Sequence, residues 1–218
     1  MRTLIRHLLA ILLLIVLIGL FALGRPGLHP LHFWNRIIAD ASFVLLCLTL
    51  ALGPLVKFVP RLRFLLPWRR ELGIAFTVSA SLHVAIYTSN FNWNFLRFFA
   101  TAGKEGGIKW LNNAFAIANW TGLIALLYAL ILTLTSNDFT QRYLGRGWKF
   151  LQQQSYTLFV LVLLHTAIFL YLVFDEREDA IRPLFIVVAF FALILQAAGY
   201  LYTVRLQRRR RRPGAEQR

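Results

Sequence analysis

Two apolar stretches, LGIAFTVSASLHVAIY at residues 72–87 and YTLFVLVLLHTAIFLY at residues 156–171, decide the fold class of this chain. Neither contains a lysine, arginine, aspartate or glutamate, and each holds one histidine, His83 in the first and His165 in the second. Runs of this kind, with their flanks, reach the roughly 20 residues that a membrane-spanning helix needs. An ionisable side chain inside such a helix indicates a functional site.

The rest of the chain has the same character. Of its 218 residues, 58% are hydrophobic and 15% are charged, whereas soluble domains carry about 25% charged residues. Six apolar segments are long enough to span a membrane, approximately residues 4–23, 37–59, 72–90, 114–136, 151–174 and 183–204. Strand-like alternation is absent, which argues against a membrane β-barrel. We therefore predict an all-α, polytopic six-helix bundle over residues 1–204, followed by a basic tail over residues 205–218.

The basic residues are distributed unevenly between the predicted connections. One side of a six-span arrangement carries Arg2, Arg6, Lys57, Arg61, Arg63, Arg69, Arg70, Arg142, Arg146, Lys149 and the tail. On the other side fewer basic residues occur, and an acidic turn over residues 175–182 dilutes them. The positive-inside rule then places both termini in the cytoplasm. The formal charge of +15 is better explained by anionic lipid headgroups than by nucleic acid, because the charges flank the spans.

The connections differ in composition. Residues 25–36 contain two prolines and a glycine and are predicted to form an outer loop. Residues 91–113 are rich in aromatic side chains and are expected to lie partly on the outer membrane surface. Cys47 is the only cysteine, which excludes disulfides within the chain and cysteine-bound clusters.

The matching depth of the two histidines suggests that both bind the same metal. Both host segments begin at the cytoplasmic side, and the helical rise places His83 about 20 Å and His165 about 24 Å beyond those starts. Imidazoles that face each other from adjacent helices can supply both axial positions of a haem. Ser79, Ala80 and Gly122 are small enough to leave room for the macrocycle. Zinc or non-haem iron would need further ligands at that depth. The alternative is that each histidine only forms a hydrogen bond with a neighbouring helix.

The other ionisable candidates carry less information. His7 is expected at the cytoplasmic interface. His29 and His32 lie in the predicted outer loop, where they could cover a haem edge or bind a surface metal. Asp40 is expected to face lipid headgroups.

Two blocks of residues carry a resemblance to a known family. The first block consists of Arg69-Arg70-Glu71-Leu72-Gly73, Leu82-His83 and Tyr87; the second consists of Leu134-Thr135-Ser136, Gln141-Arg142, Leu144-Gly145, Trp148, Leu151, Tyr156 and His165. Together they resemble the bacterial ferric-reductase-like transmembrane family, and within it the haem-binding membrane subunits of periplasmic methionine-sulfoxide reductase systems. The resemblance covers roughly residues 37–172.

The resemblance implies a haem b electron-transfer subunit of an oxidoreductase system, with His83 and His165 as the axial ligands. Electrons would pass from a quinol or a cytoplasmic flavin reductase to a periplasmic acceptor such as a methionine-sulfoxide reductase. The family pattern places a further histidine at position 152, where this chain has Gln152, so we predict one haem. Trp148 and Gln152 are candidates for a quinone or FMN pocket. The alternatives are a non-redox scaffold or transporter that has lost haem function, and a direct ferric or cupric reductase.

Overall fold

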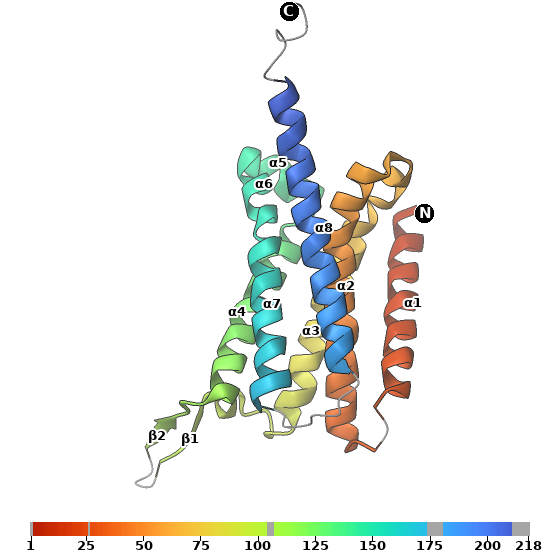
Figure 1. Cartoon of the computed structure of the whole chain (residues 1–218). Helices are drawn as coiled ribbons and strands as arrows, with labels where there is room; N and C mark the ends of the chain where they lie inside the picture. Colours follow the sequence, from red (N-terminus) through yellow and green to blue (C-terminus); the bar gives the residue numbers. More distant parts are fainter. Residues whose placement is uncertain (1, 26, 104–106, 174–180, 211–218) are drawn as a thin grey trace, which may run out of the picture.

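The computed structural model describes residues 2–25, 27–103, 107–173 and 181–210 (Figure 1). Within these ranges six helices are long and apolar enough to cross a membrane: Thr3–Leu23, Pro30–Phe58, Trp68–Ser89, Ala114–Leu134, Arg146–Val173 and Arg182–Arg208. The chain is a multi-pass membrane protein, and the number and approximate positions of the predicted spans are confirmed.

The elements follow one another along the chain in a simple up-and-down order (Figure 1). They are α1 (Arg2–Leu23), α2 (Pro30–Phe58), η1 (Pro60–Leu65), α3 (Trp68–Ser89), η2 (Phe95–Phe98), β1 (Ala100–Ala102), β2 (Ile108–Trp110), α4 (Ala114–Leu134), α5 (Asp138–Leu144), α6 (Arg146–Gln153), α7 (Ser155–Ile168), η3 (Phe169–Val173) and α8 (Ile181–Arg210). The strands β1 and β2 form an antiparallel hairpin in which Thr101 is paired with Lys109.

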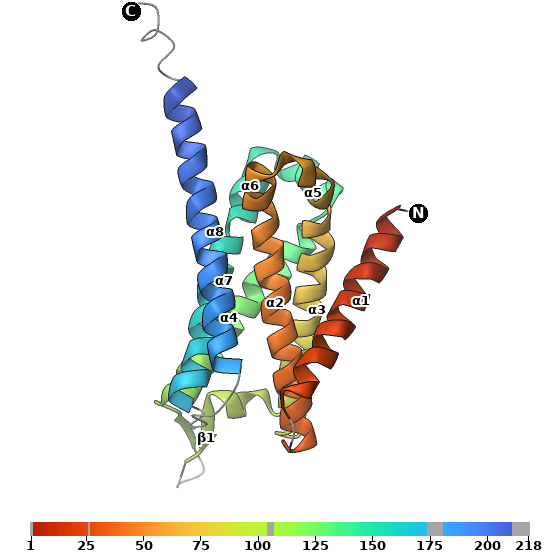
Figure 2. The ribbon, with the colours of Figure 1, turned by 45° about the vertical axis from the view of Figure 1, so that its right-hand side comes forward.

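Helix α2 occupies the centre of the bundle. It contacts α1, α3 and α8, while α4 packs against α3 and α7. Figure 2 shows α1 and α8 on opposite sides of the bundle. We call the end that holds η1, α5 and α6 the basic end, and the end that holds η2, β1 and β2 the hairpin end. Helix α1 begins and α8 ends at the basic end (Figure 1).

Hydrogen bonds between helices hold the bundle together where lipid provides no hydrophobic driving force. Ser42 on α2 donates to Ser79 on α3 at 2.8 Å, and Thr77 on α3 shares a 2.7 Å hydrogen bond with Thr133 on α4. Gln196 on α8 donates to the Leu50 carbonyl on α2 at 2.6 Å. Large apolar side chains cover much of the outer face of the spans, as expected for a surface that meets lipid.

Several connections differ from the sequence-based prediction. The expected loop at residues 25–36 is wrong in its second half, because α2 begins at Pro30. Proline suits the first helical position, since its fixed φ is helical and its missing N–H would have no helical partner there. The hairpin of β1 and β2 adds a small strand element to an otherwise all-helical fold. Most of the acidic turn at residues 175–182 lies outside the described residues.

The fifth span is continuous in space but not one regular α-helix. Gln154 separates α6 from α7, and a π-helical turn, η3, follows Ile168. Single π-helical turns inside longer helices are frequent at functional sites. This π-helical turn begins at Phe169, directly after the last turn of α7, and that last turn carries His165.

Candidate metal centre

The structure brings His83 of α3 and His165 of α7 together. Their ring centroids are 6.4 Å apart and their planes are inclined at 82°. Both rings line one cavity between the helices. The two helices run in the same direction through the membrane, which is why residues at matching depth meet in the bundle.

Each imidazole is oriented by a backbone carbonyl of a neighbouring helix. His83 Nδ1 lies 3.1 Å from the carbonyl oxygen of Asn35 on α2, and His165 Nδ1 lies 2.8 Å from that of Ala118 on α4. A carbonyl oxygen only accepts, so Nδ1 carries the proton in both rings, and the Nε2 lone pair remains for a metal. The Asn35 side chain also donates to the His83 carbonyl at 2.8 Å.

Gly122 on α4 makes the position of the His165 ring possible. A Cβ atom at position 122 would lie 2.5 Å from His165 Nδ1 and 2.6 Å from its Cε1. Such distances are far below van der Waals contact, so only glycine leaves the ring its present place. Gly122 also lines the cavity.

The cavity that contains the two histidines has a volume of about 200 Å³ and a mostly apolar lining. Ala80, Leu126 and Val162 lie along its walls. Ser79, which was also expected to leave room for a haem, is not among its described lining residues: its hydroxyl accepts a hydrogen bond from Ser42 on α2. Ala80, one position further along α3, takes the place at the cavity wall.

The residues fit a haem better than a metal held by protein ligands alone. Two imidazoles that bind one ion from opposite sides have centroids roughly 6 Å apart, because each metal–nitrogen bond is about 2.0–2.1 Å long. The observed separation of 6.4 Å agrees with this spacing. Among the described residues no group of three or more histidine, cysteine or acidic side chains could hold an ion. A porphyrin would supply the four equatorial nitrogens that the protein does not.

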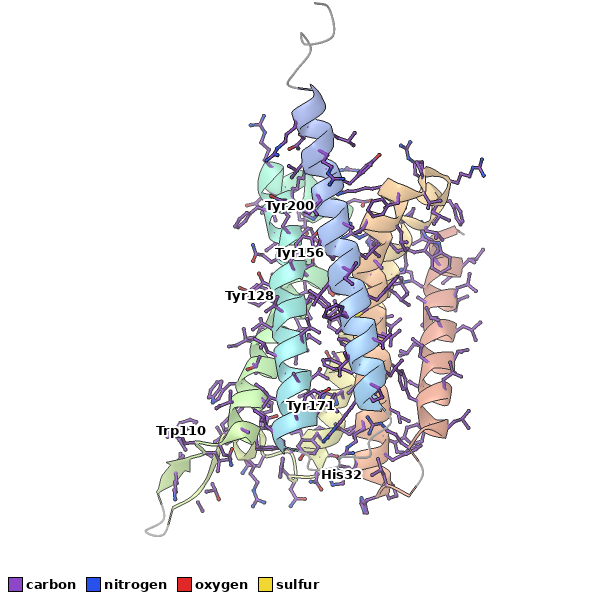
Figure 3. All side chains as sticks on the ribbon, in the orientation of Figure 1. His32, Trp110, Tyr128, Tyr156, Tyr171 and Tyr200 are labelled. Carbon is purple, nitrogen blue, oxygen red and sulfur yellow. The ribbon has the colours of Figure 1, made fainter. Side chains whose placement is uncertain are left out.

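A polar cluster of Arg25, Asp40 and His32 lies at the same cavity, and of these residues the sequence had not singled out Arg25. Arg25 Nε lies 2.8 Å from Asp40 Oδ2, both side chains are largely buried, and both residues line the cavity. The expectation that Asp40 faces lipid headgroups is therefore wrong, because an arginine from the α1–α2 connection reaches it. His32 also lines the cavity and contacts the exposed His29, with ring centroids 6.1 Å apart. Figure 3 shows His32 near the hairpin end.

Trp148 and Gln152 line a second cavity, of about 600 Å³, towards the basic end. Trp148 Nε1 donates to the Thr135 carbonyl at 2.9 Å, and the Gln152 amide lies 3.3 Å from both the Leu132 carbonyl and the Thr135 hydroxyl. No histidine is found among the described residues of its wall. Tyr156, another wall residue, is labelled in Figure 3, far from His32.

The two cavities share part of their walls. Phe76 on α3 and Ala129 on α4 line both. Glu71 of α3, buried at 1% exposure, lines the second cavity only. Glu71 belongs to the first of the two sequence blocks, but the sequence assigned it no role.

The fold and the histidine pair define a polytopic membrane protein with two neighbouring imidazoles at a cavity inside its helix bundle. The comparison with protein families gives the same class: residues 38–163 match the ferric reductase like transmembrane component. The chain belongs to this ferric-reductase-like transmembrane family, as the two sequence blocks indicated.

Individual relatives are similar at a modest level. The protein-methionine-sulfoxide reductase heme-binding subunit MsrQ of Ralstonia nicotianae is 30% identical over 159 residues, 72% of this chain and 68% of that protein. The corresponding subunit of Herminiimonas arsenicoxydans is 30% identical over 149 residues, 68% of this chain and 64% of that protein. The magnetosome protein MamZ of Magnetospirillum gryphiswaldense is 28% identical over 159 residues, 69% of this chain. The chain spans only 22% of the length of that magnetosome protein.

Proposed function

We propose that this protein is a haem b transmembrane electron-transfer protein. It would pass electrons from a quinol or a cytoplasmic flavin reductase to a periplasmic acceptor such as a methionine-sulfoxide reductase. The observation that carries the proposal is the pair His83 and His165, whose ring centroids are 6.4 Å apart and whose Nδ1 atoms are both held by backbone carbonyls.

The chain's own residues bind and orient the group. His83 and His165 would hold the haem iron, and Gly122 and Ala80 leave space beside them. The mostly apolar wall surrounds the ligand positions, and the Asn35 and Ala118 carbonyls fix the imidazole tautomers. When bound, a bis-imidazole haem supplies one-electron redox chemistry.

The arrangement of the two cavities supports electron transfer across the membrane. The second cavity lies towards the basic end, and its wall adjoins that of the first through Phe76 and Ala129. Trp148 and Gln152 are the residues we propose for a quinone or FMN at that cavity. We place the basic end and both termini in the cytoplasm of a bacterial inner membrane, because Arg61, Arg63 and their basic neighbours gather there. The basic tail would then contact anionic lipid headgroups.

The relatives support the choice of acceptor. Two heme-binding subunits of protein-methionine-sulfoxide reductases are 30% identical to this chain. A periplasmic reductase would dock at the hairpin end, where the exposed Trp34, Trp93 and Trp110 offer aromatic side chains of the kind enriched in interfaces.

A reduced-minus-oxidised absorption spectrum of the purified protein tests the proposal. We expect a b-type signal in the wild type and its loss in the His83→Ala and His165→Ala variants. His7→Ala, at the basic end, is the matched control and should retain the signal. A full b-type signal in either of the first two variants would contradict the proposal.

A second candidate acceptor is a metal ion at the hairpin end, as in a direct ferric or cupric reductase. The observation that favours it is the pair His29 and His32: their rings are 6.1 Å apart, His29 is exposed, and His32 lines the first cavity. Imidazole ligands suit copper and iron. Ferric or cupric reduction by the reduced protein that is lost in His32→Ala, with an unchanged haem spectrum, would favour this candidate over a protein acceptor.

A further inference from the structure

We infer that Glu71 makes the second cavity selective for the hydroxyl-bearing, reduced form of a quinone. The inference rests on the proposed function, which requires an electron donor at the basic end. It assigns the donor to the quinol class and gives Glu71, a residue with no role so far, the task of recognising the quinol hydroxyl.

The first observation is an unpartnered oxygen on a buried carboxylate. Glu71 Oε1 lies 3.0 Å from Arg6 Nε on α1, in an ion pair that links α1 to α3. The other carboxylate oxygen, Oε2, is buried and has no hydrogen-bond partner among the described residues. A buried polar atom without a partner costs free energy and calls for an explanation.

The second observation is that this carboxylate lines a cavity large enough for a ring-shaped ligand. Glu71 and Arg6 both contribute to the wall of the cavity of about 600 Å³. Trp148 and Tyr156 provide aromatic surface there, and Gln152 provides an amide. A donor group on a bound ring would satisfy Glu71 Oε2 and remove the cost of leaving it unpaired.

The chemistry of a carboxylate then determines which redox form is favoured. An ionised carboxylate only accepts hydrogen bonds. A quinol presents O–H groups, which can donate to Glu71, whereas the quinone presents carbonyl oxygens at the same positions, which repel it. The carboxylate therefore favours the reduced ligand, as a donor site requires.

Most of the basic side chains of the cavity wall are engaged by protein partners, which leaves them less available to a flavin phosphate. The basic residues of its described wall are Arg6, Arg69, Arg70 and Lys149. Three of these already have partners: Arg6 pairs with Glu71, Arg69 donates to the Thr49 carbonyl, and Arg70 lies 3.6 Å from Asp138. A phosphate would have to compete with these partners, and a quinol would not.

Redox-inert analogues test the inference without electron transfer. Binding of a 2-alkyl-4-hydroxyquinoline N-oxide and of its O-methyl ether to the holoprotein would be measured by isothermal titration calorimetry. The hydroxyl compound can donate to Glu71 and the ether cannot. We expect the wild type to prefer the hydroxyl compound by roughly tenfold or more, the usual effect of a hydrogen bond to a charged group. In Glu71→Gln the preference should fall to about threefold or less.

The control keeps the cavity and removes a different carboxylate. Asp138 lies on the same wall, but its side chain is 80% exposed, so Asp138→Asn should retain the wild-type preference. If Glu71→Gln does not fold, the double variant Arg6→Met with Glu71→Met replaces the whole ion pair by apolar side chains, a change that buried pairs often tolerate. It should likewise lose the preference.

Two results would overturn the inference. One is a wild type that binds both compounds equally or neither; the other is a Glu71 variant that keeps the full preference. Neither result affects the b-type spectrum, so failure of the quinol assignment is distinguishable from failure of the haem proposal.

Discussion

Gly122 on α4 lies directly against His165 on α7, so closely that a Cβ atom at position 122 would come within 2.5 Å of the imidazole Nδ1. The His165 ring lies against the α4 backbone at Gly122 because its Nδ1 forms a 2.8 Å hydrogen bond with the Ala118 carbonyl, one turn earlier on α4. Helix α4 thus supplies both the hydrogen-bond acceptor and the close backbone contact of one proposed ligand.

Gly122→Ala should therefore displace the His165 ring. Overpacking of this kind typically costs about 1–3 kcal/mol, and here the displaced group is a proposed haem ligand. We expect the haem content to fall to less than half that of the wild type, measured as the pyridine haemochromogen. Gly19→Ala is the control, because no atom lies within 4 Å of the added Cβ. Wild-type haem content in Gly122→Ala would show that His165 does not need its present position.

The neighbouring residues Ser79 and Ala80 should respond in opposite ways. Ser79→Ala removes a hydrogen bond to Ser42 but leaves the cavity wall intact. It should cost about 0.6 kcal/mol in stability with an unchanged b-type spectrum. Ala80→Leu extends a side chain into the cavity and should reduce haem content. Thermal unfolding followed by absorbance at the Soret band measures both effects. Equal haem loss in the two variants would show that Ala80 does not line the haem cavity in preference to Ser79.

Asn35→Leu tests the support of the other imidazole. The substitution removes the side-chain hydrogen bond to the His83 carbonyl but keeps the backbone carbonyl that holds His83 Nδ1. We expect destabilisation by about 1 kcal/mol and a haem signal that is retained. Complete loss of haem would mean that the amide, and not the carbonyl, positions the ring.

The haem-to-protein ratio should be one. The second cavity has no histidine among its described wall residues, and Gln152 stands where the family pattern has a histidine. Gln152→His alone should leave the ratio at one, because a bis-imidazole haem would need a second ligand opposite it. A ratio near two in the wild type, by haemochromogen assay and amino-acid analysis, would show that other side chains ligate a second haem.

The number of spans and the presence of a histidine pair could be predicted from the sequence. A membrane-spanning helix is defined by a local property, about 20 consecutive apolar residues, so each span is visible without its neighbours. The depth of His83 and His165 follows from the helical rise and the direction of each span. The resemblance to the ferric-reductase-like family also rested on local blocks, and the family comparison confirms it.

The details of the site required the tertiary structure. Whether Ser79 or Ala80 reaches the cavity depends on how α3 is rotated against α2, and adjacent positions on a helix point about 100° apart. The ion pair of Arg25 and Asp40 and the partner of Glu71 join residues of different elements. The amino-acid sequence by itself determined which segments enter the membrane and at what depth their polar residues lie. Only the packing of the helices decided which of those residues meet, because the rotation and contacts of each helix depend on all its neighbours at once.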